Sequence, residues 1–223
     1  MAKRSINKPF KDWQYEEVEQ AFGLTRYFEH ELFDKFKTFR IAEDYADKDE
    51  IESLRRLALE YIESWNEDEY KFMFISPFFR AVNFVSKYYK VFTQRPLSVK
   101  YDNDTKTTSG NVEFMLAKGK QIPQKPHFFL HESMHSAYKP EKNRDNDPLG
   151  QLLIAMVASQ KLYQDDKPIY GIYVNERNWF IVILEGKKYA TSNPYVITSE
   201  DIFDFFAILQ YFKQEMETLY QQI

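Results

Sequence analysis

The chain has 223 residues, with 30 Lys plus Arg, 34 Asp plus Glu and a formal net charge of -4. This length suits one domain that buries its own core, and 43% hydrophobic residues exclude a mainly disordered chain. The absence of cysteine excludes disulfides and thiolate metal sites. No apolar run approaches the roughly 20 residues of a membrane span, and the N-terminal stretch lacks the apolar core of a secretory signal. We therefore expect a cytoplasmic protein without a membrane partner, in which nucleic acid would need a local basic groove.

The first third of the chain predicts helices. Apolar residues recur at helical spacing over 14–22 and 27–37. Asp47 and Glu50 predict the N-cap of a further helix. Its apolar stripe comprises Ile51, Leu54, Leu57, Ala58, Tyr61, Ile62 and Trp65. Asn66 is expected to cap another helix with acidic residues in its first turn, and the helical region continues over 72–85.

The rest of the chain alternates between strands and helices. The predicted strands cover residues 91–92, 97–101, 112–117, 127–132, 169–174, 179–184 and 189–190. Asp147 followed by Pro148 predicts a helix that runs to about residue 163. Thr198 with Asp201 is expected to cap a closing helix. This order predicts a single α/β domain, with a helical part over 1–65 and a mixed central sheet with a crossover helix over 66–223.

A short histidine motif allows two interpretations. His131, Glu132 and His135 match H-E-x-x-H, which on a helix would bind one Zn²⁺ and use Glu132 as the general base of a peptidase. His127 extends the series, but a spacing of four residues places side chains together on a helix and on a strand. The sequence H-F-F-L that begins at His127 favours a strand. The zinc peptidase is therefore the alternative interpretation.

The strand interpretation allows a different metal site. Over 112–117, Val112, Phe114 and Leu116 are expected to alternate with Glu113, Met115 and Ala117. If this strand lies beside the strand at 127–132, Glu113 and Glu132 meet at one edge, where they could hold Mg²⁺. On these residues alone, two exposed strand charges are the better explanation of the pattern.

Several segments together resemble a known family. They run from about Asn66 to Phe212 and read NEDEYKFMFISPFF, NVEFMLA, PHFFLHES, DPLGQLLIAMVASQ, IYGIYV and WFIVILEGKKYATSNPY. This arrangement resembles the PD-(D/E)XK nuclease superfamily, in the branch similar to the N-terminal nuclease domain of type I restriction enzyme R subunits, as small bacterial proteins carry it alone. The resemblance implies a restriction-endonuclease-like core and Mg²⁺-dependent hydrolysis of DNA.

The resemblance also implies which residues form the site. Glu67, or else Glu69, takes the place of the acid in the helix before the sheet, Glu113 that of the first strand acid and Glu132 that of the acid in (D/E)-x-K. Mg²⁺ would lie between Glu113 and Glu132. Gln151 takes the place of a glutamine that orients water or phosphate. Independently, Gln151 shares a helix face with the small residues Ala155, Ala158 and Ser159, which allow close approach to the sheet. The alternative interpretation is an ordinary exposed glutamine on this helix.

One position departs from the family pattern. The lysine of (D/E)-x-K is replaced by Met134, whose thioether neither orients water nor stabilises negative charge. Lys71, Lys118 and Lys139 are the candidates to replace it. We therefore expect either an active nuclease or a catalytically impaired derivative that binds nucleic acid.

Two further groups of residues have simpler interpretations. The phenylalanines of the helical part, Phe28, Phe33, Phe36 and Phe39, are expected in the core rather than as platforms for bases. The basic residues near the N-terminus, Lys3, Arg4, Lys8 and Lys11, are expected to form a solvated tail.

Overall fold

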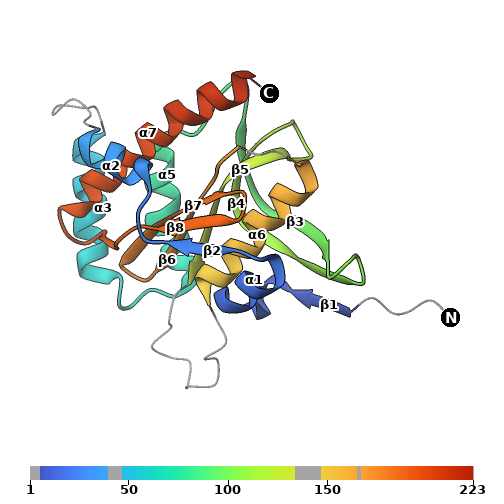
Figure 1. The fold of residues 1–223 in the computed structure, drawn as a ribbon. Coiled ribbons are helices and arrows are strands. Elements are labelled where there is room, and N and C mark those ends of the chain that lie inside the picture. The colour runs from blue at the N-terminus through green and yellow to red at the C-terminus, as the bar shows by residue number, and fades with distance from the viewer. Residues whose placement is uncertain (1–5, 40–46, 134–146, 165–166, 223) are drawn as a thin grey trace.

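The computed structural model describes residues 6–39, 47–133, 147–164 and 167–222 (Figure 1). The strands are β1 (Ile6–Pro9), β2 (Thr25–Tyr27), β3 (Lys90–Tyr101), β4 (Lys106–Lys118), β5 (Gln124–Ser133), β6 (Ile169–Asn175), β7 (Asn178–Glu185), β8 (Lys188–Thr191) and β9 (Tyr195–Val196). The α-helices are α1 (Tyr15–Phe22), α2 (Glu31–Thr38), α3 (Lys48–Tyr61), α4 (Glu67–Tyr70), α5 (Ser76–Val82), α6 (Pro148–Tyr163) and α7 (Asp201–Gln222). A 3-10 helix η1 (Phe10–Asp12) and a π-helix η2 (Lys71–Ile75) complete these elements.

One mixed sheet organises the chain. Its strand order is β1-β4-β5-β6-β7-β8-β2, with β3 paired to β4 and β9 paired to β7. Strands β3, β4 and β5 form an antiparallel series, and helix α6 then crosses over so that β6 runs parallel to β5. Strands β7 and β8 continue antiparallel. The prediction of an α/β fold with a mixed sheet and a crossover helix is confirmed.

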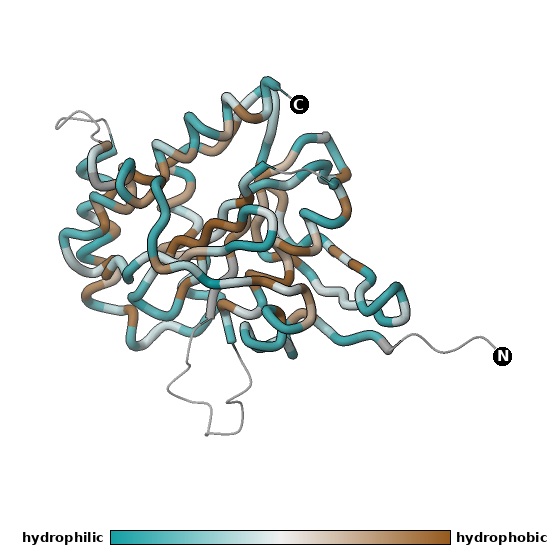
Figure 2. Tube along the Cα trace, viewed as in Figure 1, coloured by the Kyte–Doolittle hydropathy of each residue, from teal (hydrophilic) through white to brown (hydrophobic). Residues whose placement is uncertain are grey.

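Each face of the sheet has its own hydrophobic core. On one face, α3, α5 and α7 pack on β5–β7 through an aromatic cluster that includes Tyr70, Phe78 and Trp179. On the other face, α6 packs on β3, β5 and β6, and α1 packs on α6. Figure 1 shows α6 in front of the sheet, with α3, α5 and α7 gathered at the other side. Figure 2 shows the most apolar segments along the central strands and α6, between these layers.

Helix α6 begins as predicted. The Asp147 side chain accepts from the backbone N–H of Gly150 at 3.1 Å, and Pro148 occupies the first turn. The same carboxylate accepts from the backbone N–H of Tyr15 at 2.6 Å, so it also fixes the start of α1. All residues from Leu149 to Ser159 are buried, because the helix lies between the sheet and α1.

Two predictions about the strands need correction. The segments 91–92 and 97–101 belong to one strand, β3, that bends at Gln94, where φ is +50°. The alternation expected over 112–117 breaks at Glu113, since Val112 and Met115 contact the same core. Such an irregularity leaves no apolar signature, because both faces of β4 are buried against helices.

Other differences concern chain ends and caps. The N-terminal segment is not a solvated tail over its described part: β1 pairs in parallel with β4, and the buried Trp13 indole donates to Thr108 Oγ1 at 2.8 Å. The side chain that bonds the start of α7 is Ser199 rather than Thr198, and its hydroxyl accepts from the N–H of Asp201. Phe36 is buried as expected, whereas Phe28 is exposed. No helix among the described residues has the length and apolar character needed to cross a membrane.

Gly150 marks a close approach of α6 to the backbone that leads into α1. A Cβ atom on Gly150 would lie 2.7 Å from the backbone N of Tyr15 and close to two further backbone atoms. Replacing a helical glycine by alanine normally stabilises a helix by up to about 1 kcal/mol. We expect Gly150→Ala to destabilise the protein instead, by about 1–3 kcal/mol, because backbone must move. Urea unfolding measures this, with Gln160→Ala on the outer part of α6 as the control. An increase in stability for Gly150→Ala would contradict the packing.

Candidate functional site

The sheet opens along one side of β4. Strand β3 pairs with β4 along nearly its whole length. On the other side, β1 pairs with residues Lys106 to Ser109 and β5 with Phe114 to Lys118. Residues 110–113 lie between these two partners. Strand β5 leaves β4 after Leu130 but stays paired with β6 as far as Ser133. We call residues 110–113 of β4 the β4 gap.

A pocket of about 180 Å³ lies at the β4 gap. Its polar lining includes Lys11 of η1, Glu113 of β4 and Gln151 of α6, and its apolar lining includes Phe129 and Leu130 of β5. The site residues expected on β4 and on α6 therefore come together at one opening, with the end of β5 beside them. Lys11 was not predicted, since its place depends on the pairing of β1 with β4.

A lysine joins two of the predicted carboxylates. Lys71 Nζ donates to Glu67 Oε1 at 2.6 Å and contacts Glu113 Oε1 at 3.4 Å. The Glu113 side chain is only 17% exposed and that of Lys71 28%, so these charges interact with less screening than surface charges do. Glu67 and Lys71 belong to α4 and η2, whereas Gln151 belongs to α6 on the other face of the sheet. Glu113 thus lies where groups from both faces meet.

The local sequence explains how Glu67 and Lys71 are positioned. Asn66 caps α4: its side chain accepts from the N–H of Glu69, and the Glu69 carboxylate accepts from the N–H of Asn66. Glu69 is therefore occupied at the cap, and Glu67 is the acid that reaches the site. The π-helix η2 begins at Lys71, and π-helical turns are frequent at functional sites.

The pKa of Lys71 reflects two opposing effects. Burial disfavours the charged ammonium and by itself lowers its pKa. The hydrogen bond to Glu67 and the nearby charges of Glu113 and Glu67 more than offset this, so the pKa of Lys71 lies above its ordinary value. Lys71 is therefore a fixed positive charge at neutral pH and does not act as a base there.

Gln151 is positioned by the packing of α6 against β5. It is 8% exposed and lines the pocket with Leu152 and Ala155. Farther along the same helix, the Ser159 hydroxyl donates to the carbonyl of Pro126 at 2.7 Å, which holds the helix against the strand. The small residues on this face thus allow the close approach that was expected, and the interpretation of Gln151 as an exposed glutamine is wrong.

The backbone of β5 bears on the two interpretations of the histidine motif. His131 to Ser133 form a strand paired with β6, where H-E-x-x-H would need a helix. His127 is buried, and its ring packs against Tyr220. The positions of His135, Met134 and Lys139 lie outside the described residues, as do the side chains of His131 and Glu132. The backbone places Glu132 beyond the last β4–β5 pair, at the same end as Glu113.

Lys118 lies at the other end of the β4–β5 ladder, where it pairs with Gln124, so it does not approach Glu113.

Among the described residues, no three His, Cys, Asp or Glu side chains form a cluster that could hold a metal ion by themselves. Lys71, one of the three lysines considered as a replacement, contacts Glu113. Glu67 and Lys71 are four residues apart, a spacing at which side chains pair on a helix, so the sequence did indicate their ion pair.

Neither models of known protein families nor the sequences of curated proteins match this chain. Inferences about its function therefore depend on the β4 gap and on the groups that meet there.

Replacing Glu67 should change the titration of Lys71. We expect Glu67→Gln to lower the pKa of Lys71, because it removes the hydrogen bond to a charged acceptor and one nearby negative charge. Carbon-detected NMR of the lysine side chains, recorded as pH rises, measures this. Glu69→Gln is the matched control, since glutamine still accepts at the cap. An unchanged Lys71 titration in Glu67→Gln would show that the ion pair does not form in solution.

Proposed function

We propose that this protein is a restriction-endonuclease-like protein that acts on DNA, by Mg²⁺-dependent hydrolysis of phosphodiester bonds or as an impaired derivative that binds DNA. Its site comprises Glu67, Glu113, Glu132 and Gln151. The observation that carries the proposal is the β4 gap, where Glu113 contacts Lys71 and lines one pocket with Gln151. These residues are distant in sequence and come from three elements, as expected of a functional site rather than of a surface ion pair.

The topology supports the proposal. Glu113 and Glu132 lie on β4 and β5, which are adjacent strands, and both positions lie beyond the Phe114–Leu130 pair at which these strands separate. The crossover helix α6 then brings Gln151 to the same opening. The segments that resemble the nuclease family, from about Asn66 to Phe212, supply α4, β4 to β8 and α6.

The donor atoms fit Mg²⁺. This ion prefers oxygen ligands and is commonly held by one or two carboxylates together with water and substrate phosphate oxygens. The pocket offers the carboxylate of Glu113 and the amide oxygen of Gln151, and in the proposal Glu132 supplies the second carboxylate. When bound, Mg²⁺ activates water and neutralises charge on the phosphodiester.

Lys71 supplies charge that Met134 cannot. Its ammonium fixes the carboxylate of Glu113 and keeps a positive charge beside the place where the phosphate group would bind. Gln151 has an amide that donates to a phosphate oxygen or orients water. In this proposal Lys71 takes over the stabilisation of negative charge, and Gln151 is the described group that can orient the water.

Hydrolysis tests the proposal directly. We expect purified protein with Mg²⁺ to cleave DNA, and Glu113→Gln and Glu132→Ala each to reduce the rate at least about 100-fold, because each removes a metal ligand. A gel assay of a labelled duplex measures cleavage, with the exposed Glu29→Gln as the control. If wild type binds DNA but does not cleave it, the impaired derivative is the correct form of the proposal. Neither cleavage nor binding would overturn both forms.

Met134 gives a gain-of-function test. We expect Met134→Lys to raise the cleavage rate by about 10- to 1000-fold, the range that a single preorganised charged or donor group supplies. Met134→Leu keeps an apolar side chain of similar size and should leave the rate unchanged. An equal effect of both substitutions would contradict a vacated lysine position.

A further inference from the structure

Positive charge is concentrated in one part of this acidic chain. Residues 87–125, which include β3 and β4, contain eight Lys or Arg and three Asp or Glu, a net charge of +5. The whole chain carries -4, so the remaining residues carry -9. The basic residues of this segment are Lys87, Lys90, Arg95, Lys100, Lys106, Lys118, Lys120 and Lys125. A segregation of this size produces a local positive field that the overall charge hides.

Most of these charges form no ion pair with a carboxylate in the described part of the chain. Lys106 pairs with Asp102 at 3.0 Å, but Lys90, Arg95 and Lys100 form no ion pair with a described carboxylate. Lys90 and Arg95 instead lie over the ring of Phe92, at 4.7 and 5.6 Å from its centroid. This contact holds both cations beside β3 without neutralising them.

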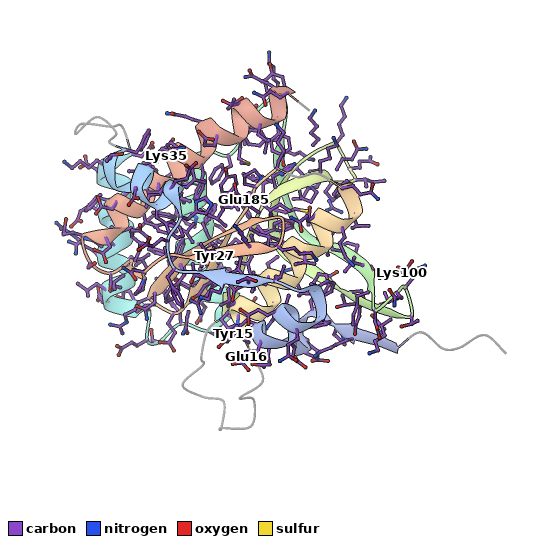
Figure 3. The ribbon with its side chains drawn as sticks, in the orientation of Figure 1. Tyr15, Glu16, Tyr27, Lys35, Lys100 and Glu185 are labelled. Atoms are coloured by element: carbon purple, nitrogen blue, oxygen red, sulfur yellow. The ribbon has the colours of Figure 1, made fainter. Side chains whose placement is uncertain are left out.

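The charges follow a free strand edge. Among the described residues β3 pairs with β4 alone, so its outer edge is open. From Lys90 to Lys100 the strand spans about 33 Å, at about 3.3 Å per residue. One turn of B-form DNA is about 34 Å. Figure 3 shows Lys100 at the margin of the molecule formed by β3, away from Lys35 on α2.

The basic residues of β3 lie close to the candidate site. The pairs Thr93–Phe114 and Arg95–Val112 flank Glu113, so Arg95 lies one strand away from the β4 gap. Neighbouring strands are about 4.8 Å apart. A polymer held along β3 therefore runs past the pocket that contains Glu113 and Gln151.

The surface lacks the features of a single-strand site. Phe92 and Tyr101 of β3 are buried, and no large apolar side chain from Tyr88 to Lys118 is among the exposed ones. Single-stranded nucleic acid is held mainly by bases that stack on exposed aromatic rings. Cations along this edge, with Lys90 and Arg95 on the face of Phe92 and Lys100 on the other face, suit the phosphate backbone of a duplex.

We propose that the outer edge of β3, with Lys90, Arg95 and Lys100, binds the phosphate backbone of a DNA duplex over about one turn. The inference rests on the proposed function for the identity of the ligand, but it concerns binding and not cleavage. Charged residues on an edge strand also prevent edge-to-edge pairing of sheets, as Pro96 does. That role alone would not make DNA affinity depend on these three cations.

Binding without catalysis tests the inference. The ligand is a fluorescent 24-base-pair DNA duplex, and fluorescence anisotropy is recorded with EDTA at several salt concentrations. We expect the triple variant Lys90→Gln, Arg95→Gln, Lys100→Gln to bind at least tenfold more weakly than wild type. Its slope of log affinity against log salt should fall by about 2 to 3, because about 0.9 of this slope arises from each phosphate contact.

A matched variant controls for net charge. Lys35→Gln, Arg56→Gln, Arg80→Gln changes the charge equally at exposed positions of α2, α3 and α5 and should bind within twofold of wild type. Equal loss in both variants, tighter binding to a single strand of the same length, or binding only to phosphatidylserine vesicles would overturn the inference. If duplex binding depends on β3 but no variant or metal condition gives cleavage, the hydrolytic form of the proposed function fails while this inference stands.

Discussion

The separation of β5 from β4 after Leu130 is the geometric constraint on which the candidate site depends. Strand β4 has partners on both sides, but on one side it exchanges β5 for β1, and residues 110–113 lie between them. Helix α6 enforces this geometry, because it is buried from Leu149 to Ser159 and must pack on β5 and β6 while α1 covers it. Gly110 lies in the gap, and a Cβ there would meet the Phe10 side chain at 2.6 Å. Close packing of η1 on the gap thus forms one wall of the pocket.

The electrostatics of the site follow from where this opening lies. A sheet covered by helices on both faces has few positions at which charged side chains from the two sides approach each other. Glu113 occupies one of them, near Lys71 on one side and in a pocket shared with Gln151 on the other. The ion pair with Lys71 lowers the cost of keeping Glu113 half-buried and charged. It also competes with a cation for the same carboxylate, so a metal at Glu113 must share it with Lys71 or displace it.

The sequence was sufficient for local structure and for much of the topology. Asp147 and Pro148 located the start of α6, the aromatic run after Pro126 distinguished a strand from a helix, and Asn66 located α4. It was not sufficient for features that depend on tertiary pairing. The pairing of β1 with β4, which brings Lys11 to the pocket, involves residues about 100 positions apart and has no local pattern. The break in alternation at Glu113 was also hidden, because helices bury both faces of β4 and apolar residues suit either face.

The bend in β3 links the site to the basic edge. At Gln94, opposite Glu113, φ is +50°, a conformation that is uncommon for residues other than glycine. Because of this bend, Phe92 and Leu97, which are an odd number of residues apart, pack in the same core. Arg95 then lies on the same side of β3 as Phe92 and can share its ring with Lys90. The irregularity at Gln94, opposite Glu113, therefore also brings Arg95 to the side of β3 that carries Lys90, so one distortion of the sheet bears on both the candidate site and the proposed binding surface.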